Sequence, residues 1–182
     1  SDLYRLAIYC LVRELRPNIY LETGVLHGLS SAFILGALAK NNHGKLISID
    51  LPSYEETGVA NADGYNYTLP NGKEPGWLIP EKLLSRWELR IGPSSSIMNE
   101  VLESQGEIDI FCHDSEHTYE TMWFELIVGW EGLKDGGIMI CDNIESNSAF
   151  HDFCRRVGRI PLIMPNMDHL PYHQPGFGIV KK

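Results

Sequence analysis

A short apolar run that ends in a glycine turn and passes directly into a helical pattern is the strongest constraint on the fold of this 182-residue chain. Residues 19–21 (Ile-Tyr-Leu) have the character of a buried strand, the turn Glu22-x-Gly24-x-x-x-Gly28 follows, and residues 29–39 have helical spacing. In open α/β sheets, a strand, a glycine turn and a helix bring backbone N–H groups and a helix N-terminus to a ligand. Gly24 has no Cβ and would let the main chain approach that ligand closely. The pattern therefore predicts a binding site at this turn.

The residues of the turn argue against two common nucleotide-binding motifs. A dinucleotide-binding turn requires G-x-G-x-x-G, whereas three residues separate Gly24 from Gly28, so an NAD-dependent oxidoreductase is disfavoured. A P-loop requires a lysine before the helix, and residues 29–31 (Leu-Ser-Ser) contain none. Glu22 at the end of the strand argues against a bound phosphate and for a cationic or hydroxyl-bearing partner.

The rest of the chain alternates helical patterns with short apolar runs. Helical patterns cover residues 3–15, 80–86, 97–103, 118–133 and 148–157, and strand patterns cover 45–49, 87–91, 108–112, 138–141, 160–164 and 177–180. Strands that alternate with helices predict one mostly parallel sheet with helices on both faces. Residues 52–79 have no sustained period and are rich in Gly, Asn, Pro and Tyr, which is typical of a functional lid or insertion. Residues 134–137 (Lys-Asp-Gly-Gly) are predicted to form a turn.

Composition limits the class of protein. A length of 182 residues fits a single domain spanning 1–182, and a net charge of -9 argues against nucleic acid as a partner. We find neither an apolar run long enough to span a bilayer nor a signal peptide, so no membrane partner is expected. The widely spaced cysteines at positions 10, 112, 141 and 154 fit buried thiols and a reducing, cytoplasmic location.

Polar residues follow five consecutive predicted strands. They are Glu22 and Gly24, then Asp50, then Gly92, Ser94 and Ser95, then His113, Asp114, Glu116 and His117, and finally Asp142 and Asn143. In open α/β sheets the ligand binds beyond the C-terminal ends of the strands, so these residues are candidates for one site.

Four segments of the chain resemble the class I methyltransferases that use S-adenosylmethionine. The segment from Glu22 to Gly28, with Gly24 between, looks like their motif I, and Asp50 matches the acid that holds the ribose hydroxyls. The region 76–92 resembles the third strand of the family, which implies that Ser94 or Ser95 faces the adenine. The resemblance implies a Rossmann-like, doubly wound α/β fold: a seven-stranded sheet with one antiparallel strand and helices on both faces.

The segments 108–119 and 136–143 narrow the resemblance to small-molecule O-methyltransferases, the catechol and caffeoyl-CoA type and their bacterial sugar and macrolide relatives. The matching positions in those enzymes hold a divalent cation, which implies Asp114, Asp142 and Asn143 here. Two carboxylates and an amide oxygen suit Mg²⁺ or Ca²⁺, and the metal would lower the pKa of a substrate hydroxyl.

His117 is the candidate general base, because histidine titrates near neutrality and bacterial relatives often carry an Asp-His pair where this chain has Glu116-His117. Plant and animal members have a lysine there. His113 is expected to be structural or to face the cofactor. The predicted reaction is O-methylation of a small hydroxylated molecule, with the acceptor selected by residues 52–79 and 165–175. Family members are often dimers, so a homodimer is one expectation.

Other interpretations remain open. The chain could be a catalytically inactive methyltransferase fold that binds a ligand, or a hydroxylase of the cephalosporin type on the same framework. A zinc site is disfavoured, because His113, Asp114, Glu116 and His117 are too crowded to face one ion together. The pair His169-x-x-x-His173 contains a proline, so its spacing does not put both rings on one helix face. The sequence contains no G-x-S-x-G motif, so a hydrolase with a serine nucleophile is disfavoured.

Overall fold

A computed structural model describes residues 2–54, 64, 67–165 and 176–182. Seven strands form one sheet in the order β3-β2-β1-β4-β5-β7-β6. They are β1 (Ile19–Thr23), β2 (Lys45–Asp50), β3 (Trp87–Ile91), β4 (Ile108–His113), β5 (Leu133–Cys141), β6 (Leu162–Pro165) and β7 (Gly176–Lys181). Strands β1 to β5 pair in parallel, whereas β7 runs antiparallel to both β5 and β6. The predicted fold class is confirmed.

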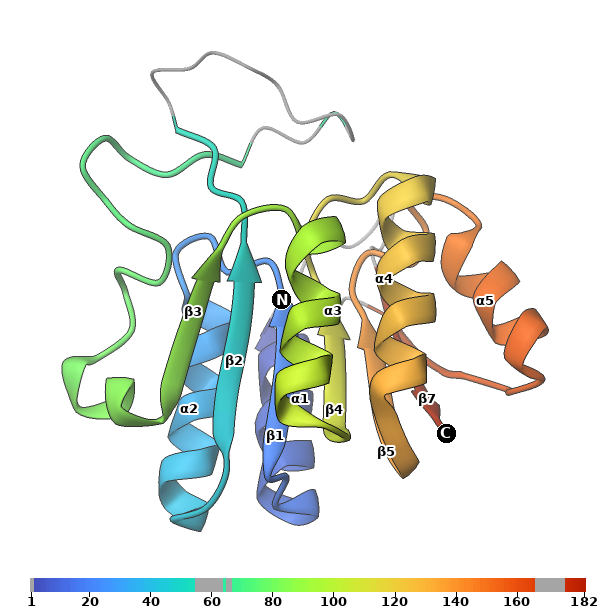
Figure 1. Ribbon diagram of the computed structural model, residues 1–182, viewed down its shortest axis with the longest axis horizontal. Helices are drawn as coiled ribbons and strands as arrows, with labels where there is room; N and C mark the ends of the chain where they lie inside the picture. Colours follow the sequence, from blue (N-terminus) through green and yellow to red (C-terminus); the bar gives the residue numbers. More distant parts are fainter. Residues whose placement is uncertain (1, 55–63, 65–66, 166–175) are drawn as a thin grey trace.

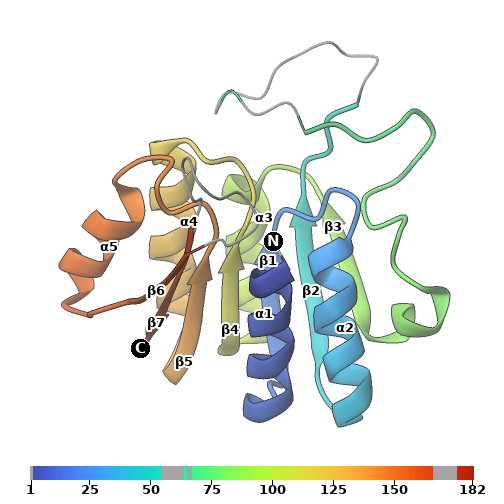
Figure 2. The same cartoon turned by 180° about the vertical axis from the view of Figure 1, so that it is seen from behind.

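Helices cover both faces of the sheet. Helices α1 (Asp2–Leu15) and α2 (Leu29–Asn41) lie on one face, and α3 (Ser94–Gln105), α4 (Tyr119–Gly132) and α5 (Ala149–Val157) lie on the other (Figures 1 and 2). A short 3-10 helix, η2 (Glu81–Arg86), precedes β3. Among the residues that the structure describes, no helix has the length and apolar character needed to cross a bilayer.

The central strands separate two apolar cores. Leu21 and Phe111 pack in the core beneath α3, α4 and α5, whereas their neighbours Tyr20 and Ile110 pack in the core beneath α1 and α2. All four side chains are completely buried. Successive side chains of a strand point to opposite faces, so a strand covered on both sides must be apolar along its whole length. This explains why β1 and β4 appear in the sequence as continuous apolar runs.

Two predicted boundaries are wrong for identifiable reasons. Residues 134–137 lie within β5, because Gly136, with φ of +78°, accompanies a register shift between β4 and β5 rather than ending the strand. Helix α3 begins at Ser94, three residues before the predicted start, since Pro93 occupies the N-cap position and the serines form the first turn.

The described part of residues 52–79 packs against the glycine turn. The N–H groups of Gly76 and Leu78 donate to the carbonyls of Leu26 and His27, at 2.8 and 3.1 Å, and Trp77 Nε1 donates to His27 Nδ1 at 3.0 Å. Residues 76–78 are therefore held against the glycine turn by three hydrogen bonds. Residues 55–63 and 65–66 of the predicted lid, and residues 166–175 with the histidine pair at 169 and 173, lie outside the described residues.

Candidate functional site

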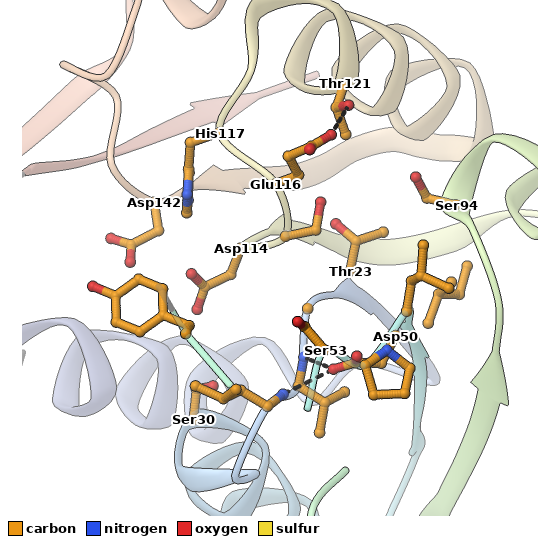
Figure 3. A pocket seen from close by; sticks show the side chains of 18 of the residues that line it. Thr23, Ser30, Asp50, Ser53, Ser94, Asp114, Glu116, His117, Thr121 and Asp142 are labelled. Atoms are coloured by element: carbon orange, nitrogen blue, oxygen red, sulfur yellow. Dashed lines mark hydrogen bonds between the residues drawn. The ribbon is translucent and has the colours of Figure 1, made fainter. Parts of the chain in front are cut away.

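A cavity of about 880 Å³ opens at the C-terminal ends of strands β1 to β5 (Figure 3). The predicted site residues on its wall are Gly24, Asp50, Gly92, Ser94, Ser95, Asp114, Glu116, His117, Asp142 and Asn143. The fold therefore brings together residues that follow five different strands. Glu22, Gly28 and His113 are not among the lining residues, and each has a role within the protein instead.

The glycine turn is shaped by contacts within the protein. Gly24 has φ of +85°, and a Cβ there would lie 1.9 Å from the carbonyl oxygen of Asp114. A Cβ at Gly28, with φ of +83°, would lie 2.6 Å from the Cα of Gly76. The sequence predicts that Gly24 allows a ligand to approach closely, but the atom nearest to a Cβ at this position is the backbone carbonyl oxygen of Asp114. Only glycine fits such positions without strain.

Asp50 at the end of β2 holds the turn from the opposite side. Its Oδ2 accepts hydrogen bonds from the backbone N–H groups of Val25 and Leu26, at 2.6 and 2.8 Å (Figure 3). Burial raises the pKa of Asp50, and these two hydrogen bonds oppose that shift without cancelling it. One oxygen of the carboxylate thus supports the turn, while the residue itself lines the cavity.

Glu22 lies beneath the cavity rather than on its wall. The hydroxyls of Ser31 and Ser48 each donate to Glu22 Oε1 at 2.6 Å, and Trp87 Nε1 donates to Ser48 Oγ at 2.7 Å. Burial raises the pKa of Glu22 to about 7, even though both serine hydrogen bonds act to lower it. Glu22 therefore links β1 to α2, β2 and β3, which makes it a support of the turn in this structure.

Asp114 and Asp142 meet at the ends of β4 and β5. Burial, followed by the negative charge of Asp142, raises the pKa of Asp114 well above its ordinary value, and burial also raises the pKa of Asp142. Asn143, with φ of +48°, lines the cavity beside them. Within the described residues no three His, Cys, Asp or Glu side chains form a metal cluster, so a cation here would also need the Asn143 amide oxygen.

The two histidines after β4 have different surroundings. His117 lines the cavity, is 7% exposed, and points toward Asp114 and Asp142 in Figure 3. His113 is completely buried, and its Nδ1 lies 2.6 Å from Oε2 of Glu125. The rings of the two histidines are 5.4 Å apart and meet edge to face. Of the pair, only His117 can meet a ligand in the cavity.

Comparison with known families identifies the chain. The model of a methyltransferase domain family matches residues 21–144, which include the glycine turn, Asp50, Asp114 and Asp142. The chain belongs to this methyltransferase family. No curated protein matches the sequence.

Solved structures of other methyltransferases share the fold. An O-methyltransferase from Bacillus cereus in complex with SAH, 14% identical, has a TM-score of 0.68 over 100% of this chain and 82% of its own. The O-methyltransferase TomG from Streptomyces achromogenes in complex with SAM, 16% identical, has a TM-score of 0.65 over 100% of this chain and 80% of its own. At these identities the similarity establishes the fold of the methyltransferase domain alone.

Several residues that line the cavity were not predicted from the sequence. Tyr4 and Arg5 come from α1, which the sequence marked only as an amphipathic helix, and Ser30 comes from the first turn of α2. The hydroxyl of Tyr4 lies 3.5 Å from Asp114 Oδ2. The carboxylate of Glu116, also on the wall, accepts a 2.8 Å hydrogen bond from Thr121 (Figure 3). No local pattern distinguishes Tyr4 or Ser30 from residues of an ordinary helix face.

Proposed function

We propose that this chain is an S-adenosylmethionine-dependent methyltransferase that transfers a methyl group to an oxygen of a small hydroxylated molecule. The observation that carries the proposal is the convergence of Gly24, Asp50, Asp114 and Asp142 on one cavity, within the segment that the methyltransferase family model matches. The crystallised complexes of structural neighbours with SAM and SAH support the choice of cofactor.

The cofactor would extend from the end of β3 to the end of β4. Asp50 would accept hydrogen bonds from the ribose hydroxyls, because a carboxylate has lone pairs to spare beyond the two amides it already serves. Ser94 or Ser95 would face the adenine. The carboxylates around the cavity favour a sulfonium cation electrostatically. Glu22, Gly28 and His113 would shape this site from beneath.

We also propose that Asp114, Asp142 and Asn143 hold a divalent cation such as Mg²⁺ or Ca²⁺. Burial raises the pKa of both half-buried carboxylates, and the negative charge of Asp142 raises that of Asp114 further, so a cation between them would be stabilised. All three side chains offer the hard oxygen donors that these ions prefer. The ion would supply Lewis acidity toward an acceptor hydroxyl. His117, beside the carboxylate pair, would take the proton from that hydroxyl, since an imidazole can act as a base near neutral pH.

The remaining features of the proposal concern partners and location. The acceptor is proposed to be a small molecule rather than nucleic acid, in keeping with the net charge of -9. A homodimer and a reducing cytoplasmic setting complete the proposal, the latter supported by four free cysteines. Cys112, Cys141 and Cys154 are buried as expected, whereas the expectation is wrong for Cys10, which is exposed on α1.

Calorimetric titration with S-adenosylhomocysteine, with and without Mg²⁺, tests the cofactor and the metal separately. We expect Asp50→Ala to weaken cofactor binding by roughly 10- to 100-fold, the worth of hydrogen bonds to a charged group. Asp50→Asn keeps an acceptor for the Val25 and Leu26 amides and so separates support of the turn from contact with the ligand. Asp142→Ala should abolish the magnesium signal. The exposed Asp135, near the start of β5, provides the control Asp135→Ala.

The same experiment discriminates the alternative functions. A folded wild-type protein that fails to bind S-adenosylhomocysteine would refute the methyltransferase proposal. Binding without methyl transfer to any hydroxylated acceptor would favour the inactive ligand-binding fold. Turnover that requires a second cosubstrate would favour the cephalosporin-type hydroxylase.

A further inference from the structure

A completely buried carboxylate lies directly behind the cavity. Glu125, in the second turn of α4, has no solvent exposure and accepts hydrogen bonds from several side chains. Against the effect of burial, His113 and hydrogen-bonding side chains that include Ser94 on the cavity wall lower the pKa of this carboxyl group. His113 Nδ1 lies 2.6 Å from its Oε2, Thr23 Oγ1 donates to the same oxygen, and Ser115 Oγ donates to Oε1 at 2.8 Å. A carboxylate can only accept hydrogen bonds, so each of these partners is a donor, and Nδ1 of His113 carries a proton.

The partners of Glu125 occupy a critical place in the sheet. Thr23 and His113 are the last residues of β1 and β4 and face each other in the parallel pairing. They directly precede Gly24 and Asp114, and the N–H of Asp114 donates to the carbonyl of Thr23 at 2.9 Å. Thr23 and Ser115 also line the cavity. One carboxylate from α4 therefore binds side chains on both strands at the point where they diverge into the site.

The ends of β1 and β4 can move very little relative to each other. A single Cβ on Gly24 would come within 1.9 Å of the carbonyl oxygen of Asp114, so the two backbones are already in close contact. A shift of one strand end relative to the other would displace either the glycine turn or the Asp114 carboxylate. Misplacement of a site by a fraction of an ångström is enough to reduce binding or rate substantially.

We propose that Glu125 is a positioning residue, which fixes Gly24 and Asp114 relative to each other by holding Thr23, His113 and Ser115. This inference rests on the proposed function, because it assigns Glu125 to the shape of the cofactor site. Glu125 touches no ligand itself, since it does not line the cavity. The competing interpretation is a buried hydrogen-bond network that contributes only to overall stability, in which case any equally destabilising change in α4 would have the same effect.

The test compares Glu125→Gln with a control on the same helix. Glutamine has nearly the same shape, but its amide nitrogen cannot accept a hydrogen bond, so it can serve only part of this network. Leu126→Ala truncates the adjacent buried side chain, which packs in the core under α3, α4 and α5 and not on the cavity. The dissociation constant of S-adenosylhomocysteine is measured by calorimetry at a temperature where circular dichroism finds all variants folded.

We expect Glu125→Gln to weaken S-adenosylhomocysteine binding by on the order of 10-fold, as for other residues that orient a binding group, and Leu126→Ala to leave it unchanged. Equal affinities for the wild type and Glu125→Gln, or equal losses in both variants, would overturn the inference while leaving the proposed function intact. Failure of the wild type to bind would refute the proposed function itself. If Glu125→Gln does not fold, His113→Asn and His113→Leu replace it, because His113 does not line the cavity. His113→Leu, which has no donor for Glu125, should weaken binding more than His113→Asn, and equal affinities of the two variants would overturn the inference.

Discussion

Replacing Glu22 by glutamine should remove a pH dependence of stability that this single carboxyl group generates. Glu22 is 2% exposed, and burial raises its pKa from 4.5 to about 7 in the folded protein, against the effect of the two serine hydrogen bonds. In the unfolded chain the group regains its ordinary pKa. Between the two pKa values the folded state binds more protons than the unfolded state, so the free energy of unfolding falls as the pH rises.

The size of the effect follows from the two pKa values. The stability that Glu22 contributes by taking up a proton is complete below its unfolded pKa of 4.5 and is lost as the pH rises through about 7. The difference between the two values corresponds to about 3 kcal/mol. Glutamine keeps an acceptor oxygen for Ser31 and Ser48 but does not titrate, so the stability of Glu22→Gln should lack this component.

Urea unfolding of both proteins across this pH range measures the effect. Asp50, Asp114 and Asp142 also have raised pKa values, but they titrate in both proteins, so the difference in unfolding free energy reports Glu22 together with its charge coupling to Asp50 and Asp114. That difference should change by about 3 kcal/mol in favour of the glutamine variant between pH 4.5 and pH values above 7. A difference that stays constant with pH would refute the assignment of Glu22 as a buried, proton-binding support.

Three glycine substitutions test the packing, each by thermal and urea unfolding. Gly24→Ala should destabilise the protein by at least about 1–3 kcal/mol through backbone strain alone, and more through the clash with the Asp114 carbonyl. Gly36→Ala, within α2 and with no described atom within 4 Å of the new Cβ, should stabilise by about 1 kcal/mol, the helix propensity of alanine over glycine. Gly129→Ala has the same propensity advantage in α4, but its Cβ would lie 2.4 Å from the Phe111 ring, so we expect a net loss of roughly 1–3 kcal/mol. Equal stabilisation by the two helical variants would contradict the close contact at Gly129.

The course of the chain could be predicted from the sequence, because the two faces of the sheet are covered and apolar runs mark the strands. The position of Asp50 on the cavity wall follows from the same logic, since every parallel strand delivers its last residues to the same edge. The extent of β5 could not be predicted in this way. Residues 134–137 have the sequence of a turn, and they belong to β5 only because pairing with β4 continues on both sides of them, at Leu133 and Ile138.

Residues that support the site from beneath were the least predictable. Glu22 was expected to meet a ligand, because the sequence does not reveal that Ser31 and Ser48 converge on it from α2 and β2. Glu125 did leave a signal. It is an acid between the buried apolar residues Met122 and Leu126 of α4, and a charge on a buried helix face requires partners. The identity of those partners depends on the tertiary structure.

The hydrogen bonds that join the glycine turn to Asp50 and to the segment around Gly76 have a kinetic consequence. Residues 25–27 have their backbone conformation fixed by β2 on one side and by residues 76–78 on the other, entirely through groups of the protein. Little conformational entropy is therefore left for this turn to lose when a ligand arrives. The association rate of a cofactor should then reflect diffusion and electrostatic steering into an acidic cavity, and differences in affinity among variants of the turn should appear mainly as differences in residence time.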